Sequence, residues 1–288
     1  MKKTIVAVMA LTAAAAAFGV AYDPKVHGNP IEVTGDAVVE IDGQGATVDG
    51  GGKARCATLG PNVTLKNFTF TNGKADLGGG VCGGKIVNCT VSGCTASEAG
   101  AALFGTVAVG CTLKANRFAN GDSTAAAHGG VACESTLIAC TLTGNAAVFG
   151  SEAPAFGGVG DRVTVTDCAV SGNSVSCGDM VCYGLRFASS TVNGKYVELD
   201  DAIGTPLTMP ANTYYVCFTG GDGATGEMPV VAWKRNKVYA LPKNAFVRAD
   251  KKTFRGWAGS NGRRYDGGLA VFNLAESGKT LVLTAIWQ

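Results

Sequence analysis

The sequence of 288 residues predicts an all-β protein, with a solenoid in its first two thirds and a small β module after it. Two observations predict the solenoid: a short Cys-Thr-Val-like segment keeps returning, and the 42 glycines cluster between β-branched runs. The central residues of successive copies are separated by 21, 22, 29, 28 and 22 positions. These central residues are Phe68, Cys89, Cys111, Cys140, Cys168 and Ser190. A change of composition near residue 205, after which all three tryptophans lie, predicts the second module.

The first part of the solenoid alternates short β-branched runs with glycine clusters. Residues 31–33, 38–41 and 46–48 are the runs, and glycine stands at positions 43, 45, 50, 51 and 52. Such a pattern is typical of short strands joined by sharp turns.

Each later unit has three parts, as one coil of a stacked parallel structure requires. A Gly-rich apolar segment such as 79–82 is followed by a Val/Thr/Ile strand such as 163–165, and then by the Cys-Thr-Val element. This element closes with an asparagine at a fixed offset in Asn116, Asn145 and Asn173. We expect the three asparagines to form a ladder at one turn, bonded through their side-chain amides.

These motifs carry two resemblances. Residues 40–50 followed by 61–68 resemble the opening coils of right-handed parallel β-helix proteins of the pectate lyase-like superfamily. The units between about residues 60 and 195 resemble the repeats of chlamydial-type polymorphic outer-membrane proteins, although cysteine replaces phenylalanine in four copies. The resemblance implies a right-handed parallel β-helix solenoid over residues 22–205.

Equivalent positions of neighbouring coils lie about 4.8 Å apart, so the repeated cysteines should form one column in the core. Two interpretations of this column remain open. The favoured one is that the thiols are small buried fillers, and the other is that neighbours form disulfide bonds. A metal site is not expected, because no Cys-x-x-Cys pair or histidine cluster accompanies them. The column consists of Cys89, Cys111, Cys140 and Cys168.

The first 21 residues have the pattern of a Sec-type signal peptide, with a basic start and an uncharged Ala-rich run. We expect cleavage after Ala21 and a secreted or cell-surface protein, with an uncleaved anchor as the alternative. No transmembrane segment is expected after signal removal. Export permits disulfide bonds, and an odd total of 11 cysteines leaves at least one thiol unpaired.

Polysaccharide lyases and hydrolases use this fold, but their chemistry needs a cationic base with acidic Ca²⁺ ligands, or paired carboxylates. The carboxylates of the solenoid are instead single and spread, and we expect at most a weak acidic contact stripe on the loop face. No catalytic residue, cofactor or metal ligand is therefore expected, and no pattern for nucleic-acid binding occurs. The carboxylates of this stripe are Asp76, Glu98, Asp122, Glu152 and Asp179.

Residues 206–288 resemble a Listeria–Bacteroides repeat, the internalin-type B repeat. The resemblance rests on the segment 254–257, which reads Phe-Arg-Gly-Trp, and on the final 283–287, which reads Leu-Thr-Ala-Ile-Trp. It implies a small β-grasp-like module that serves as a stalk or adhesive unit. Apolar residues alternate in 216–218 and 281–285, which predicts strands with one buried face and core positions for the tryptophans. Arg263 and Arg264 beside Tyr265 are the candidate exposed contact.

Charge is distributed unevenly between the two parts. Residues 22–205 carry 11 Lys/Arg against 17 Asp/Glu, whereas residues 206–288 carry 11 against 5. We expect a bacterial cell-surface or secreted protein that acts in adhesion or extracellular binding, with glycans or an envelope component as partners. The alternatives are a glycan-active (lyase-like or hydrolase-like) or glycan-binding solenoid, and a spacer without a ligand.

Overall fold

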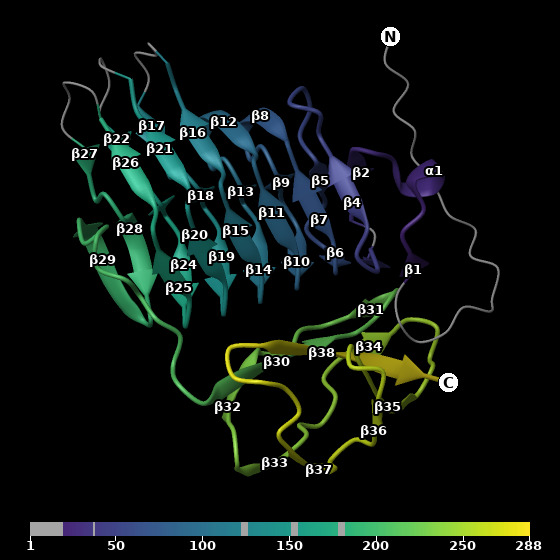
Figure 1. The fold of residues 1–288 in the computed structure, drawn as a ribbon. Coiled ribbons are helices and arrows are strands. Elements are labelled where there is room, and N and C mark those ends of the chain that lie inside the picture. Colours follow the sequence, from purple (N-terminus) through teal and green to yellow (C-terminus); the bar gives the residue numbers. More distant parts are fainter. Residues whose placement is uncertain (1–19, 37, 122–125, 151–154, 178–181) are drawn as a thin grey trace.

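The computed structural model describes residues 20–36, 38–121, 126–150, 155–177 and 182–288. The predicted all-β class is confirmed, because these residues form long sheets of stacked parallel strands and one short helix (Figure 1). The helix α1 (Pro24–His27) is capped by Asp23, whose side chain accepts a hydrogen bond from the backbone N–H of Lys25.

Three parallel sheets run along the stack, and each coil contributes short strands to them. The largest sheet has two runs of parallel strands that are joined by β28 (Phe187–Val192) at the end of the stack. The first run is β1 (Val20–Ala21), β3 (Val39–Asp42), β6 (Val63–Lys66), β10 (Lys85–Val87), β14 (Val107–Val109), β19 (Thr136–Ile138) and β24 (Thr164–Thr166). The second run is β2 (Ile31–Val33), β5 (Ala57–Leu59), β9 (Val81–Cys82), β13 (Leu103–Phe104), β18 (Ala132–Cys133) and β23 (Gly160–Asp161).

The other two sheets complete each coil. The second sheet is β4 (Thr47–Asp49), β7 (Thr69–Thr71), β11 (Thr90–Ser92), β15 (Thr112–Lys114), β20 (Thr141–Thr143) and β25 (Ala169–Ser171). The third has one run with β8 (Lys74–Leu77), β12 (Thr95–Ala99), β16 (Arg117–Ala119), β21 (Ala146–Val148) and β26 (Ser174–Ser176). Its other run is β17 (Ala127–His128), β22 (Ala155–Phe156) and β27 (Cys182–Tyr183).

The strand registers explain the sequence repeat. Val91 of β11 pairs with Phe70 in the coil before and with Leu113 in the coil after, so equivalent residues stack directly. In the second sheet the middle residue of each strand points into the stack and its neighbours point out, because side chains alternate along a strand. One column of these inward side chains, all at most 2% exposed, is Phe70, Val91, Leu113, Leu142 and Val170.

The turn between the first and second sheets requires a left-handed backbone. Asn67, Asn88 and Asp167 occupy it with φ of 58°, 52° and 52°, a conformation that Asn and Asp tolerate better than most residues. Gly110 holds the same turn position with φ of 63°. A Cβ atom there would lie 2.6 Å from Thr280 Oγ1 of the carboxy-terminal sheet, so this coil must carry glycine.

The predicted asparagine ladder is present at the turn between the second and third sheets. Asn116 Nδ2 donates to Asn145 Oδ1 at 3.0 Å, and Asn145 Nδ2 donates to Asn173 Oδ1 at 2.8 Å. The same Oδ1 atoms accept from the backbone N–H of the preceding coil, and Asn145 Nδ2 also reaches the carbonyl of Leu113 at 2.9 Å. Buried amides with complete hydrogen bonding thus fix the turn.

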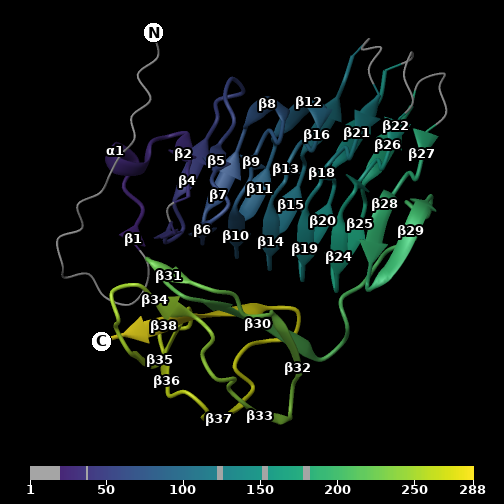
Figure 2. The same ribbon diagram turned by 180° about the vertical axis from the view of Figure 1, so that it is seen from behind.

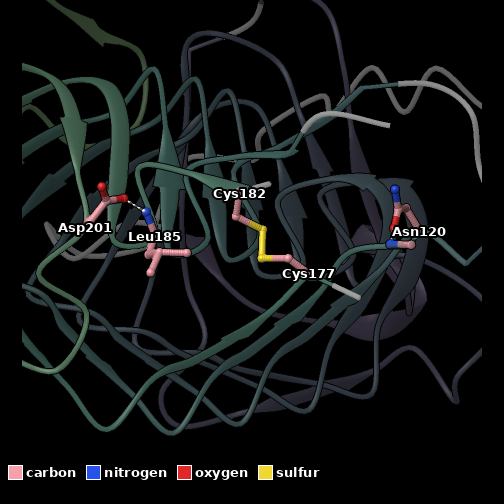
Figure 3. The surroundings of a disulfide bond; sticks show 6 residues. Asn120, Cys177, Cys182, Leu185 and Asp201 are labelled. Atoms are coloured by element: carbon pink, nitrogen blue, oxygen red, sulfur yellow. Dashed lines mark hydrogen bonds between the residues drawn. A yellow bond between two sulfur atoms is a disulfide. The ribbon is translucent and has the colours of Figure 1, made fainter. Parts of the chain in front are cut away.

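The end of the stack is closed by the chain itself. The strand β29 (Lys195–Asp200) pairs antiparallel with β28, and Arg186 Nε donates to Asp200 Oδ2 at 2.9 Å. Figure 3 shows the disulfide bond of the last coil, which joins Cys177 to Cys182. Near it, the backbone N–H of Leu185 donates to Asp201 Oδ1 at 2.9 Å.

The carboxy-terminal residues form a five-stranded mixed sheet. Its strands, in spatial order, are β32 (Val231–Lys234), β30 (Thr213–Thr219), β38 (Thr280–Trp287), β35 (Phe254–Gly259) and β36 (Arg264–Tyr265). Two small antiparallel pairs complete it, β31 (Ala224–Thr225) with β34 (Val247–Arg248) and β33 (Val238–Ala240) with β37 (Ala270–Phe272). Trp257 is fully buried in the core of this module, as expected, and Trp287 packs against that core.

The prediction that these strands have one buried face is wrong for both: all seven residues of β30 are buried, and so are residues 281–285 of β38. Tyr214, Val216 and Phe218 face the core of the module. The opposite face packs against the solenoid, where Cys217 and Val282 form a cluster with Val87 and Val109. Figures 1 and 2 show the module lying along the side of the stack. The alternation in the sequence described only the face turned to the module's own core.

Candidate binding surface

An open groove of about 630 Å³ crosses the outer surface of the third sheet. It reaches from the glycine-rich turn at 50–54 in the first coil to β16 in the fourth. Three exposed cations, Lys53, Lys74 and Arg117, lie along it. The remaining polar side chains of the groove are Asp76, Thr95 and Ser97.

The coil register determines the order of these side chains. Thr95 pairs with Lys74 on one side and with Arg117 on the other, so the three form one outward column. Since coils repeat every 4.8 Å or so, Lys74 and Arg117 are anchored about 10 Å apart. The next residues, Ala96 and Phe118, point inward and are buried, which fixes the column on the outer face.

Asp76 and Glu98 lie on adjacent strands, β8 and β12, rather than in loops as the sequence indicated. Both are exposed, and Asp76 Oδ1 accepts a hydrogen bond from Ser97 Oγ at 2.7 Å. Among the residues that line the groove, Asp76 is the one carboxylate beside the three cations. The remaining members of the predicted acidic stripe, Asp122, Glu152 and Asp179, lie outside the described residues.

The cysteine column lies inside the stack and away from the groove. Each thiol donates to the carbonyl two residues earlier, for example Cys111 to Val109 at 3.4 Å and Cys168 to Thr166 at 3.4 Å. The sulfur also accepts from the backbone of the preceding coil, as in Cys140 N–H to Cys168 Sγ at 3.2 Å. All four members are buried and are free thiols in the structure: Cys89, Cys111, Cys140 and Cys168.

A second polar group, which the sequence did not reveal, surrounds Asp161 at a corner of the stack. His128 Nδ1 lies 2.9 Å from Asp161 Oδ2, and Arg162 Nε donates to the same oxygen at 3.2 Å. Arg162 also pairs with Glu134 at 2.8 Å and donates to Cys133 Sγ at 3.6 Å. The carboxylate of Asp161 is 4% exposed, so these partners compensate a buried charge.

Coil spacing is a signal that could have found part of this group. His128 and Asp161 are 33 residues apart and belong to neighbouring coils. The registers place Cys133 opposite Asp161 and His128 opposite Phe156, with their rings stacked at 5.4 Å between centroids. Aligning the coils at the 28-residue step places Cys133 opposite Asp161, but it leaves His128 opposite Phe156, so the spacing alone does not pair the histidine with the carboxylate.

Burial raises the pKa of the Cys133 thiol to about 11, although Arg162 opposes the shift. The unfolded thiol loses its proton near pH 8.5, so between pH 8.5 and 11 the folded state binds more protons and its stability falls as pH rises. We expect Cys133→Ala to remove about 2 kcal/mol of the stability loss between pH 8 and 10. Urea denaturation of both proteins at these two pH values measures the difference. Equal losses in both would contradict the assignment.

The predicted contact at 263–265 is only partly exposed. Arg263 and Arg264 are exposed, but Tyr265 is 8% exposed and packs in the core of the module. Its hydroxyl accepts a hydrogen bond from Asn261 Nδ2 at 2.8 Å. Strand alternation in β36 points Tyr265 inward when Arg264 points outward, so the three side chains do not form one surface.

A buried ion pair lies where the carboxy-terminal sheet meets the solenoid. Lys66 Nζ donates to Glu40 Oε1 at 2.6 Å, and both side chains are 5% exposed. Hydroxyl groups of the docked sheet complete the arrangement, with Thr284 Oγ1 at 3.2 Å from Lys66 Nζ and Thr219 Oγ1 at 3.3 Å from Glu40 Oε1. Lys66 Nζ also lies 3.9 Å from Asp42 Oδ2, so the buried ammonium group has two carboxylates of β3 and a hydroxyl of the docked sheet around it.

Of the predicted signal peptide, residues 1–19 lie outside the described residues. Val20 and Ala21 form β1 and pair with Ile41 and Asp42 of β3. In the part of the chain that the structure describes, no helix has the length and apolar character needed to cross a membrane. Among the same residues, no three metal-ligating side chains gather closely enough to hold an ion.

The chain matches no known protein-family model, no curated protein and no solved structure. Its architecture is therefore defined by its own strands and registers, and its function is inferred from the surfaces described above.

Proposed function

We propose that the protein is an exported, non-catalytic binding protein that holds an anionic extracellular polymer, such as an acidic glycan, in the groove of the third sheet. The supporting observation is the line of Lys53, Lys74 and Arg117 across four successive coils. Three cations and one carboxylate give the groove a positive balance, within a solenoid that carries more acidic than basic residues. The location of this charge favours a binding role.

In this proposal residues 22–205 are a right-handed parallel β-helix and residues 206–288 a module of the internalin-type B-repeat kind. Stacked parallel strands with an in-register column of core residues support the first part. The second part is supported by the resemblance of residues 254–257 and 283–287 and by their position in the adjacent strands β35 and β38. The Sec-type start of the chain and the disulfide bond Cys177–Cys182 support export.

The geometry suits an extended polymer better than a small ligand. The groove is open, and its cations are distributed along the stack axis rather than converging on one point. Because each coil rises about 4.8 Å, Lys74 and Arg117 are two coils apart along the groove, and such separated cations can contact successive carboxylate or sulfate groups of a polymer. The hydroxyls of Thr95 and Ser97 between the cations add hydrogen bonds to neutral oxygen atoms of a glycan.

Reversing two of the charges tests the proposal. We expect wild-type protein to bind immobilised sulfated and uronate-rich polysaccharides, and Lys74→Glu combined with Arg117→Glu to weaken binding about tenfold or more. Binding should also weaken with added salt, because exposed charges are screened. Surface plasmon resonance at 50 and 300 mM salt would measure both effects.

The matched control is Lys237→Glu combined with Lys243→Glu, which makes the same change of net charge on exposed residues of the other module. Retained binding in this control, together with loss in the groove variant, supports the groove. An equal loss of binding in both variants would mean that only the net charge of the protein matters, and it would contradict the proposal that the groove is the binding site. New reducing or unsaturated sugar ends after incubation with these polymers would contradict the non-catalytic role.

A further inference from the structure

A cleft of about 500 Å³ lies between the carboxy-terminal module and the outer face of the first sheet. On the solenoid side it reaches from Glu40 of β3, in the first coil, to Ile138 of β19, in the fifth. On the module side it is bordered by residues 218–221 and 224–230. Pockets of this size, with largely apolar walls and a position between two domains, are frequent ligand sites.

Loose docking of the module does not explain the cleft, because the two parts fit closely beside it. Val87 and Val109 of the solenoid form one buried cluster with Cys217 and Val282 of the module, and none of the four is more than 1% exposed. Val109 also lines the cleft, so the cleft opens directly beside this tight contact. Val107, on the same strand, lines the cleft and is 37% exposed. An apolar side chain is thus left uncovered where a ligand could cover it.

The solenoid wall of the cleft changes from polar to apolar along the stack. One outward column reads, in register from coil to coil, Glu40, Thr64, Lys85 and Val107. The fifth coil adds Ile138 to the same wall. The wall is therefore amphiphilic, with hydroxyl and ammonium groups in its second and third coils and hydrocarbon in its fourth and fifth.

The module wall extends the apolar end. Val230 packs, like Ile138, against the buried cluster that contains Val109, which places it beside the fourth and fifth coils. The other end of this wall lies at the first coil, where Gly223 N–H donates to the carbonyl of Val38 at 3.3 Å. Hydrocarbon from both parts of the protein therefore surrounds one end of the cleft.

Lys85 is the one cation among the residues that line the cleft, and it lacks a compensating charge. Its side chain is partly buried, and it takes part in no ion pair between residues that the structure describes. Glu40, in the same column, is already bonded to Lys66 at 2.6 Å, and the other carboxylate of the cleft, Glu227, is exposed to solvent. Burial raises the pKa of Cys217, so that thiol stays neutral. An ammonium group beside apolar walls favours a ligand with an anionic group.

We propose that this cleft binds a fatty acid of medium chain length. The carboxylate accepts hydrogen bonds from Lys85 Nζ and from the hydroxyl of Thr64, its neighbour in register, and the acyl chain lies along Val107 and Ile138. From Lys85 to Ile138 the wall covers two coil steps, or about 10 Å. One acyl chain spans about 15 Å in a bilayer whose hydrocarbon core is about 30 Å thick. The apolar end therefore suits a chain about two thirds as long, such as that of decanoate.

An acyl chain suits the cleft better than a peptide segment. Backbone N–H and C=O groups of a peptide would need hydrogen-bond partners along its whole length, and burying them without partners is costly. The side chains of Val107, Ile138 and Val230 offer no such partners at the apolar end. An acyl chain needs polar contacts only at its head group, where Lys85 and Thr64 supply them.

Calorimetric titration of the full-length protein with decanoate tests the proposal. We expect saturable binding to wild type, and binding of 1-decanol that is about tenfold or more weaker, because a neutral hydroxyl gains less from Lys85. Lys85→Met should reduce the affinity for decanoate about tenfold and leave the affinity for 1-decanol unchanged. The comparison of the two ligands needs only wild-type protein, so it decides the outcome even if a variant folds poorly.

The apolar end is tested by Val107→Asn, which should weaken the binding of both ligands severalfold. Its matched control is Val238→Asn, the same change at a valine of the module that is 67% exposed and does not line the cleft, and it should bind as wild type does. Tryptophan fluorescence during thermal denaturation verifies that each variant is folded.

Three results would overturn the proposal. They are the absence of saturable decanoate binding to wild type, equal affinities for decanoate and 1-decanol, and unchanged decanoate binding in folded Lys85→Met and Val107→Asn. Binding to vesicles of anionic phospholipid without affinity for free decanoate would also overturn it, since the ligand would then be a membrane lipid. The outcome is independent of polymer binding, because the cleft shares no lining residue with the groove of the third sheet.

Discussion

Replacing Lys66 by methionine is expected to lower the free energy of unfolding by about 3–5 kcal/mol. The substitution leaves the carboxylate of Glu40, 5% exposed, without its cation between the solenoid and the carboxy-terminal sheet. The hydroxyls of Thr219 and Thr284 remain, but neutral donors compensate a buried charge less well than an ammonium group. Urea denaturation followed by tryptophan fluorescence measures the loss, since all three tryptophans lie in the docked module.

Two controls separate this effect from a general response to charge. Lys66→Met combined with Glu40→Leu removes both charges, and we expect it to regain most of the loss. Arg235→Ala breaks the ion pair with Glu276, which is 76% exposed, and should cost about 1 kcal/mol or less. Similar costs for Lys66→Met and Arg235→Ala would show that the buried pair does not hold the module to the solenoid.

Replacing Asn145 by alanine is expected to cost about 3–4 kcal/mol, because the middle member of the ladder has the most partners. Its Oδ1 accepts from the backbone N–H and the Nδ2 of Asn116, and its Nδ2 donates to Leu113 and Asn173. All these groups are buried or partly buried, and removing one partner leaves them unsatisfied. Thermal and urea denaturation would both report the change.

The matched control is Asn62→Ala, in which an exposed amide loses a single hydrogen bond to the carbonyl of Asp36. We expect that change to stay within about 0.5 kcal/mol, as for most surface substitutions. If Asn145→Ala were equally mild, the ladder would be a consequence of the turn and not its cause. Asn145→Asp should be destabilising as well, since a carboxylate cannot donate to Asn173.

The regular stacking of parallel strands could be predicted from the sequence because each set of stacked strands interacts only with its neighbours. Every coil has an apolar residue at the same inward position. Val91 and Leu113, which pair in the structure, therefore also occupy equivalent positions of the sequence repeat. The ladder of asparagines was predictable for the same reason. The group around Asp161 was not, since His128 finds its partner in the next coil and the coil lengths vary.

The candidate groove was missed for a related reason. Lys74 and Arg117 look like scattered charges until the register places them in one column, and Lys53 joins the groove from the turn of a coil that lacks a strand in the third sheet. The predicted acidic stripe included Asp76, which does lie in the groove. The prediction expected a negatively charged surface there, whereas the groove carries more cations than carboxylates. Outward positions tolerate many residue types, so their pattern carries little information about a site.

The sequence by itself determined the all-β class, the coil period and the inward columns. Equivalent positions of stacked coils have the same surroundings, so the same kind of side chain recurs there along the chain. Only the tertiary structure decided which side chains of different coils meet at Asp161, and that β30 is buried on both faces. Such contacts depend on where coils of unequal length close and on how the sheet docks. A non-local arrangement of this kind leaves no periodic pattern in the sequence.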